Sequence, residues 1–390
     1  MTRHARTPTV VGSALSDYPK APHLSERQHH AQALSRALQD AGLKLTDIDG
    51  YMCASMGRET AISMAEYFRI DHKVIGGVGP GGAVFEWMVQ QASAQIRDGQ
   101  CETVAITYGS DLYSRSGRSL GTAGFYRAGS TIEGAEQFEV PYGSTIVGAY
   151  AMAARRHMHE YGTTSEQLAN IAVTCREHAA LNPHAMYRKP LTVDDVLSSR
   201  MIAEPLHMLD CCVVSDGGGA IILTTAERAK NLPSKPVYVL AAAGTQTHWN
   251  ISEMPDYTVA PSAVSGPRAF AEAGIKPSDV DTIQLYDSFT ITVLLMLEGL
   301  GFCERGEGGP FAASGALKLG GVLPMNTDGG GLSACHSGMR GLHLLVEAVR
   351  QLRGEAGDAQ VPDCRIALAC GSGGFLSGHA VVILGTEATL

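Results

Sequence analysis

The chain has 390 residues, of which 45% are apolar and 18% are charged. This balance supplies enough apolar side chains for a sizeable core and excludes a chain dominated by disorder. The formal net charge is −9 and no long run of Lys or Arg occurs, which argues against nucleic acid or an anionic membrane as the main partner.

The first residues and the cysteines indicate a soluble protein of a reducing compartment. Residues 1–8 are basic and polar without an apolar core, so we expect no signal peptide. No run of about 18 apolar residues occurs, so we expect no transmembrane helix. The nine cysteines form no C-x-x-C pair, which favours a cytoplasmic protein with reduced cysteines in its core. No His/Cys/Asp cluster has metal-ligand spacing, so we expect no bound metal.

An internal repeat organises the chain. Residues 41–49 (AGLKLTDID) match residues 273–281 (AGIKPSDVD). Each stretch follows an alanine-rich helix, begins with a glycine suited to a left-handed helix stop, and leads into a strand. We expect the helices over 32–40 and 267–272, the stops at Gly42 and Gly274, and the strands over 50–54 and 282–286.

The repeat continues to the end of each half. Further strands are expected at 103–107 and 217–223 in the first half, and at 365–369 and 380–384 in the second. Strands that alternate with helices predict mostly parallel sheets covered by helices, hence an α/β fold. We expect two such halves, 1–230 and 236–390, joined by the proline-punctuated turn 231–236.

The first half carries a long insertion over residues 112–141. It is rich in Gly, Ser, Tyr and Arg and only weakly periodic. Loops of this length in compact domains are usually functional or disordered. Because aromatic residues are frequent in it, we favour a loop that covers a ligand or contacts a second subunit. These aromatic residues are Tyr113, Phe125, Tyr126 and Phe138, with Tyr142 just beyond.

Four segments together resemble the thiolase superfamily, most closely the sterol-carrier-protein-type thiolases and their lipid-transfer-protein relatives. They are His207–Ala220 (HMLDCCVVSDGGGA), Leu285–Phe289 (LYDSF), Asn326–His336 (NTDGGGLSACH) and Gln351–Gly357 (QLRGEAG). The resemblance implies a five-layered αβαβα fold made of two duplicated halves with two mixed sheets. It also implies a CoA-thioester substrate, no tightly bound cofactor, a homodimer, and a small OB-fold, zinc-ribbon partner protein.

The sequence departs from this family at the nucleophile. Most thiolases carry a reactive cysteine in a turn that opens a buried helix, where a thiolate attacks a thioester. Here the turn is glycine-rich and the cysteine position falls at Gly82, while residues 74–92 contain neither Cys nor Ser. An acyl-enzyme at this turn is therefore excluded. The amides of Gly81 and Gly82 could instead cradle an oxyanion, or the glycines could serve only close helix packing.

Two residues of the second half are the main candidates for catalysis. His336 aligns with a family histidine that polarises the thioester oxygen, and an imidazole can donate to an enolate oxygen or move a proton near pH 7. Tyr286 stands where the family has a histidine or asparagine, and a phenol can exchange a proton with an alkoxide. Related proteins without the cysteine include retro-aldolases that use a tyrosine in this region. We expect Asn326 and Gly330, with the glycine turn, to bind the thioester.

Three further residues are weaker candidates. Cys370 is an imperfect match to the family's second catalytic cysteine and is a possible acid or base. His379 begins a strand close by in sequence. Cys335 could replace the lost nucleophile, but adjacent residues such as Cys335 and His336 rarely face each other.

Three functions follow from these residues. The first is retro-aldol cleavage of a β-hydroxyacyl-CoA, which needs no acyl-enzyme and so fits the glycine turn. The second is thiolase or acyltransferase chemistry on a β-ketoacyl-CoA, which requires a nucleophile that the sequence does not place. The third is an inactive acyl-CoA-binding scaffold, against which the retained His336 and the Asn326 turn argue. The acyl group itself, whether steroid, aromatic or terpenoid, is left open.

Overall fold

A computed structural model describes residues 3–57, 59–77, 79, 81–116 and 132–390. Its strands are β1 (Pro8–Leu15), β2 (Gly50–Ser55), β3 (Val74–Gly76), β4 (Thr103–Ser110), β5 (Met201–Ala203), β6 (Leu206–His207), β7 (Gly217–Thr225), β8 (Val237–Gln246), β9 (Thr282–Leu285), β10 (Ile366–Gly373) and β11 (Gly378–Gly385). Its helices are α1 (Glu26–Ala41), α2 (Ala61–Phe68), α3 (Val84–Arg97), α4 (Leu112–Ser116), α5 (Glu136–Glu139), α6 (Ile146–Tyr161), α7 (Ser165–Leu181), α8 (Val193–Ser198), α9 (Ala226–Ala229), α10 (Ser262–Ala273), α11 (Thr290–Gly299), α12 (Gly308–Ala313) and α13 (Gly341–Arg353).

The strand order repeats between the two halves. In the first half β2, β4, β7 and β1 are neighbours, joined by one parallel and then two antiparallel ladders. In the second half β9, β10, β11 and β8 follow the same order with the same directions. The helix that precedes each matching segment ends at a left-handed glycine, Gly42 with φ 66° and Gly274 with φ 70°. The expected helix stops are therefore confirmed.

The expected helices begin earlier than their apolar pattern indicated. Helix α1 starts at Glu26 because Ser25 caps it reciprocally with Gln28. Helix α10 starts at Ser262, so Pro267 lies inside it rather than at its first turn.

The two expected mixed sheets are joined to each other at one place, by the pairing of β1 with β8. Two residue pairs, Thr9 with Tyr238 and Val10 with Val237, join the two sets of strands into one nine-stranded mixed sheet. The fold class, a duplicated thiolase-type α/β architecture, is confirmed. The domain boundary at 231–236 stays a prediction.

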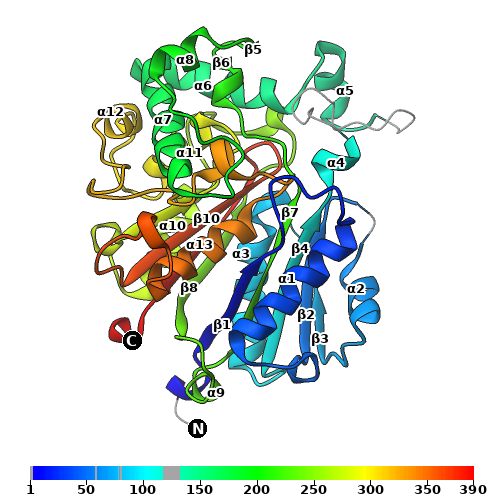
Figure 1. Cartoon of the computed structure of the whole chain (residues 1–390). Coiled ribbons are helices and arrows are strands. Elements are labelled where there is room, and N and C mark those ends of the chain that lie inside the picture. Colours follow the sequence, from blue (N-terminus) through cyan, green and yellow to red (C-terminus); the bar gives the residue numbers. More distant parts are fainter. Residues whose placement is uncertain (1–2, 58, 78, 80, 117–131) are drawn as a thin grey trace.

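Helices form three layers around the strands (Figure 1). Helix α1 contacts β1, β4 and β7 on one outer face, and α10 contacts β8 and β11 on the other. Helices α3 and α13 contact each other, and each also contacts strands of both halves. They therefore form the central layer of the five expected. A helix enclosed by sheets must be apolar on nearly all sides, which makes any charged residue in it notable.

A group of helices lies beyond one end of the strands (Figure 1). It contains α6, α7 and α8 of the first half together with α11 and α12 of the second. The described parts of the 112–141 insertion, including α4 and α5, lie on the same side. Phe125 and Tyr126 fall outside the described residues. No helix of the described chain is long and apolar enough to cross a membrane.

Candidate active site

Tyr286 and His336 meet in the middle of the molecule. Tyr286 directly follows β9, and its N–H donates to the carbonyl of Cys370 in β10 at 3.0 Å. His336 lies in the turn between a short π-helix (Gly330–Ala334) and α13. The hydroxyl of Tyr286 is 3.1 Å from Nε2 of His336, and the rings are perpendicular with centroids 5.5 Å apart. Both side chains are about 95% buried.

The ring of Tyr286 fills the space of a side chain that residue 82 lacks. A Cβ placed on Gly82 would collide with the ring and hydroxyl of Tyr286. Gly82 belongs to the 3-10 turn Gly81–Ala83 that opens α3, so the expected glycine turn at a helix start is confirmed. Amides at a helix start have no intrahelical acceptor and point toward a ligand. The phenol thus occupies the volume that a side chain at residue 82 would need.

The tyrosine and histidine are both neutral at neutral pH. Burial, with a smaller effect from the Arg340 guanidinium, lowers the pKa of His336 to about 3. Burial raises the pKa of Tyr286 well above its usual value. Nδ1 of His336 has no hydrogen-bond partner among the described residues. Since no second contact fixes the tautomer, the ring can accept a proton from the phenol or donate one to it.

A buried charge cluster holds the turn that carries His336. Arg340 is fully buried and donates to both carboxylate oxygens of Asp328, at 2.6 and 2.7 Å, and to the carbonyl of Cys335 at 2.7 Å. Asp287, next to Tyr286, lies 3.5 Å from Nε of Arg340. Burial favours the neutral acid at Asp328, but the Arg340 charge outweighs it and lowers the pKa of that carboxyl. One guanidinium therefore ties the segments of Tyr286 and His336 together.

Asn326 and Gly330 hold backbone segments that adjoin the site. The side chain of Asn326 accepts from the N–H of Leu285 at 2.8 Å and donates to its carbonyl at 2.9 Å. Both polar atoms of Asn326 are thus used on the residue that precedes Tyr286. The N–H of Gly330 donates to Asp328 at 2.9 Å. In this structure both residues shape the backbone around the tyrosine, while thioester binding by them stays a prediction.

The side chain of Cys335 has different partners from the side chain of His336. Its thiol contacts the hydroxyl of Ser215 at 3.2 Å and Nε2 of His343 at 3.5 Å. Burial raises the pKa of Cys335 to about 12, so the thiol is not a nucleophile at neutral pH. The same Ser215 hydroxyl accepts the backbone N–H of His336 at 3.0 Å. These contacts help to fix the position of His336.

Cys370 and His379 lie on neighbouring strands beside the pair. Cys370 is next to Tyr286 through the backbone, and burial raises the pKa of its thiol well above the usual value. His379 pairs with Ser372 across β10 and β11, and neither of its ring nitrogens has a hydrogen-bond partner among the described residues. Burial lowers the pKa of His379 to about 3. Neither side chain makes a hydrogen bond to the side chain of Tyr286 or His336 among the described residues, so their catalytic roles stay predictions.

Glu86 is a buried carboxyl near the site that no sequence pattern predicted. It lies in the first turn of α3, 1% exposed, and neither carboxyl oxygen has a hydrogen-bond partner among the described residues. Gly341 makes room for it, since a Cβ there would lie 2.6 Å from a carboxyl oxygen, and Gly371 does the same from β10. The signal in the sequence is a glutamate that stands between two large aromatic residues, Phe85 and Trp87.

Glu86 makes stability depend on pH. Burial raises its pKa well above the usual value, so the folded protein keeps a proton that the unfolded chain loses above about pH 4.3. The free energy of unfolding then falls as pH rises, by at most about 1.4 kcal/mol per pH unit. We expect Glu86→Gln to remove this pH dependence. The free energy of unfolding of the variant, compared with that of wild type, should therefore increase between pH 5 and pH 8. Urea unfolding at each pH measures it, and a constant difference would contradict the protonated state.

Two cavities lie in the region of the site, one at the start of α6 and one against the glycine turn. One, of about 400 Å³, is lined by the aromatic residues Phe138, Tyr142 and Tyr257 and by the start of α6. It is linked to the site through Tyr150, whose hydroxyl donates to the carbonyl of Gly374 at 3.3 Å, and Gly374 packs on Gly81. The other, of about 590 Å³, lies between β2, α2, β3 and the turn, and includes Gly81 and Met339 in its wall.

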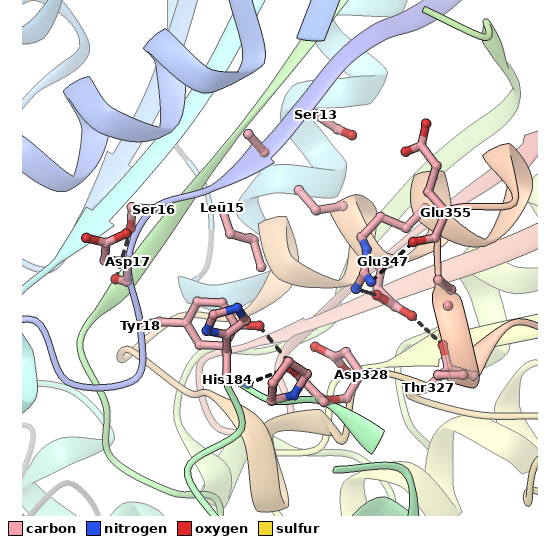
Figure 2. Close-up of a pocket in the computed structure, with 18 of the residues that line it drawn as sticks. Ser13, Leu15, Ser16, Asp17, Tyr18, His184, Thr327, Asp328, Glu347 and Glu355 are labelled. Atoms are coloured by element: carbon pink, nitrogen blue, oxygen red, sulfur yellow. Dashed lines mark hydrogen bonds and ion pairs between the residues drawn. The ribbon is translucent and has the colours of Figure 1, made fainter. Parts of the chain in front are cut away.

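A third cavity, of about 900 Å³, lies away from the pair (Figure 2). Tyr18 and His184 lie side by side in its wall, together with Ser16 and Asp17, and Thr327 and Glu347 lie across from them. The hydroxyl of Thr327 donates to Glu347 at 2.7 Å. No candidate catalytic residue lines this cavity. Across the described ranges, no group of three or more His, Cys, Asp or Glu side chains is arranged to hold a metal ion.

Known proteins resemble this chain over nearly its whole length. The family described as thiolase C-terminal domain-like matches residues 243–386. A steroid side-chain-cleaving aldolase of Thermomonospora curvata is 37% identical over 97% of each chain. A 17-hydroxy-3-oxo-4-pregnene-20-carboxyl-CoA lyase of Mycobacterium tuberculosis is 39% identical over 88% of this chain and 91% of that one.

A solved structure agrees with these relatives. The structure described as an Ltp2-ChsH2(DUF35) aldolase superimposes with a TM-score of 0.88 and 34% identity. The match covers 98% of this chain and 99% of that one.

Proposed function

The chain belongs to the thiolase superfamily, in its sterol-carrier-protein-type subgroup, and is an acyl-CoA carbon–carbon lyase of the aldolase kind; we propose that Tyr286 and His336 together move the proton in its reaction. The reaction is the retro-aldol cleavage of a β-hydroxyacyl-CoA. The observation that carries the residue assignment is the 3.1 Å contact between the phenol and Nε2 of the imidazole, made in the volume that a nucleophile at residue 82 would need.

The proton moves along the pair as the carbon–carbon bond breaks. The β-hydroxyl of the substrate gives its proton to the oxygen of Tyr286, whose own proton passes to Nε2 of His336. The electrons of the substrate's own O–H bond form the C=O double bond of the leaving ketone or aldehyde. The Cα–Cβ electron pair moves onto the thioester as an enolate. Tyr286 and His336 then return the proton to Cα of the enolate. Atoms and charge therefore balance, and no acyl-enzyme forms.

The low pKa of His336 is compatible with this role. An isolated imidazolium is unfavourable in the buried site, as its pKa of about 3 shows. In the reaction, however, the imidazolium forms together with a negative enolate, so the site never holds a lone charge. We assign the amides of Gly81 and Gly82 as donors to the enolate oxygen. Donors of this kind typically contribute about 3–4 kcal/mol each to the transition state.

We assign the 400 Å³ aromatic cavity to the uncharged pantetheine arm of the CoA thioester. Its rim includes the exposed Phe138 and Tyr142 from the end of the 112–141 insertion, which supports the interpretation of that insertion as a cover for the ligand. Tyr150 and Gly374 connect it to the glycine turn. Coenzyme A would enter as part of the substrate.

Two substrates distinguish cleavage from acyl transfer. With a β-hydroxyacyl-CoA we expect release of a carbonyl product without added CoA. With a β-ketoacyl-CoA plus CoA we expect no thiolysis, since the thiols of Cys335 and Cys370 are held protonated by burial. Iodoacetamide should leave the cleavage rate unchanged. Thiolysis that iodoacetamide blocks would instead show that the protein acts as a thiolase.

Gly82→Ala tests the contact between the turn and the phenol. The added methyl group would displace the Tyr286 ring from His336, so we expect kcat/KM for cleavage to fall at least about 100-fold, the lower end of proton-transfer contributions. Gly82→Ala should also lower the free energy of unfolding. This loss should be smaller when Tyr286→Ala is already present, because the ring is then absent. Wild-type activity of Gly82→Ala would show that the ring need not occupy this place.

A homodimer and a small second protein complete the proposal. Strand β3 is the outermost strand of the nine-stranded sheet, and among the described residues no further strand pairs with its outer edge. Ile75 in this strand is exposed, which suits pairing with a second copy. The similarity to an aldolase solved with a ChsH2(DUF35) chain supports a small OB-fold, zinc-ribbon partner. Light scattering after gel filtration tests the dimer. Absence of any such protein from material purified at native levels would count against the partner.

A further inference from the structure

The hydroxyl of Tyr108 bridges two backbone groups of the turn that follows His336. Tyr108 lies in β4 of the first half and is fully buried. Its hydroxyl donates to the carbonyl of Ser337 at 2.5 Å and accepts the N–H of Met339 at 3.1 Å. Because a buried carbonyl and a buried N–H each need a partner, one side chain of the first half satisfies two backbone groups of the second.

Neighbouring rings hold Tyr108 in one place. Phe85 of α3 and His30 of α1 contact its ring edge to face, with ring centroids 5.2 and 6.4 Å away. Burial raises the pKa of Tyr108, so the hydroxyl keeps the proton that it donates to Ser337. A side chain that packing restricts in this way can fix the backbone to which it binds.

The ring of His336 depends on its backbone for its direction. Its Nε2 lies 3.1 Å from the Tyr286 hydroxyl, and its Nδ1 has no hydrogen-bond partner among the described residues. Ser215 takes both backbone groups of His336, since its hydroxyl accepts the N–H at 3.0 Å and its own N–H donates to the carbonyl at 3.2 Å. Tyr108 takes the groups that come next along the chain. The histidine backbone is therefore held by the first half of the molecule, at the residue itself and just beyond it.

We propose that Tyr108 is a positioning residue for carbon–carbon cleavage: its hydroxyl holds the turn from Ser337 to Met339 and so keeps the His336 ring within reach of the Tyr286 hydroxyl. Both hydrogen bonds of the Tyr108 hydroxyl go to the backbone of this turn, so the residue acts through His336. This inference rests on the proposed role of His336 in proton transfer. A displacement of about 1 Å at a reacting group can lower a rate about 100-fold.

Tyr108→Phe tests this role because it removes only the hydroxyl. For a β-hydroxyacyl-CoA that wild type cleaves, we expect kcat to fall about 10- to 100-fold and KM to stay within about twofold. Tyr51→Phe is the matched control. Tyr51 is equally buried on the neighbouring strand β2, but its hydroxyl pairs with Thr107 at 2.6 Å, away from the turn, so its kcat should stay close to that of wild type. Equal losses in the two variants, or a change in KM alone, would overturn the proposal.

A spectroscopic measurement separates positioning from a general loss of packing. In protein labelled with ¹³C at Cε1 of histidine, the resonance of His336 is the one missing from His336→Gln. We expect Tyr108→Phe to shift or split this resonance and to leave those of His157 and His379, which are also buried, in place. An unmoved His336 resonance, or equal shifts at all three histidines, would contradict the proposed role. If wild type cleaves no β-hydroxyacyl-CoA, the retro-aldol function fails, while the His336 resonance still decides whether Tyr108 positions the ring.

Discussion

Tyr286→Phe is expected to lower kcat/KM for carbon–carbon cleavage by about a thousandfold while the protein stays folded. The substitution removes only the hydroxyl that contacts Nε2 of His336 at 3.1 Å, and positioned proton transfer contributes about 10²–10⁴ to rate. The loss of one hydrogen bond should lower stability by no more than about 1.5 kcal/mol. Steady-state kinetics and thermal unfolding measure the two effects separately.

Tyr238→Phe is the matched control. Tyr238 is equally buried, but it lies on β8 in the ladder that joins the two halves, where it pairs with Thr9. We expect its kcat/KM to remain within twofold of wild type. Activity of Tyr286→Phe within tenfold of wild type would remove the phenol from the mechanism and leave His336 as the only base.

Arg340→Met should have the largest effect on stability, a loss of about 3–5 kcal/mol in the free energy of unfolding. Arg340 is the partner of two buried carboxylates, Asp328 at 2.6 Å and Asp287 at 3.5 Å. Removing it leaves both carboxylates buried without a counter-charge. The carbonyl of Cys335 also loses its donor, so the turn with His336 is released. Equilibrium unfolding in urea measures the loss.

Two companion variants separate charge from packing. Adding Asp328→Asn to Arg340→Met removes one uncompensated charge and should recover part of the stability. Arg305→Met breaks a partly exposed pair with Asp256 and should change stability by less than about 1 kcal/mol. The Arg340→Met protein should also gain relative stability as pH falls, because its unpaired carboxyls then bind protons. A loss equal to that of Arg305→Met would mean that the cluster is solvated.

The repeat and the glycine turn were predictable because local chemistry determines them. Gly42 and Gly274 stop helices through their own backbone, and the matched segments after them show the duplication without any tertiary information. The β1–β8 joint rests on only two residue pairs, too few to leave a pattern in the sequence. The contact between Gly82 and Tyr286 joins residues about two hundred positions apart, so only the folded chain brings them together.

Buried charges were the other element that the sequence concealed. Glu86 and Arg340 stand near the starts of α3 and α13, positions at which charged residues are usually solvated. Their burial follows from the central layer, where each helix contacts strands of both halves. A single sequence shows the helices but not that they are enclosed, so the significance of their charges appeared only in the structure.

The shared volume of residue 82 and Tyr286 also constrains how this site can change over time. A side chain at position 82 would collide with the Tyr286 ring where it now lies, so a cysteine there requires the ring to move. A thiolase ancestor would therefore have lost its nucleophile before, or together with, the arrival of the phenol. The change from the tyrosine to the cysteine meets the same obstacle, since Gly82→Cys alone would place a thiol against the ring of Tyr286. In this geometry a change from one chemistry to the other therefore involves both positions, 82 and 286.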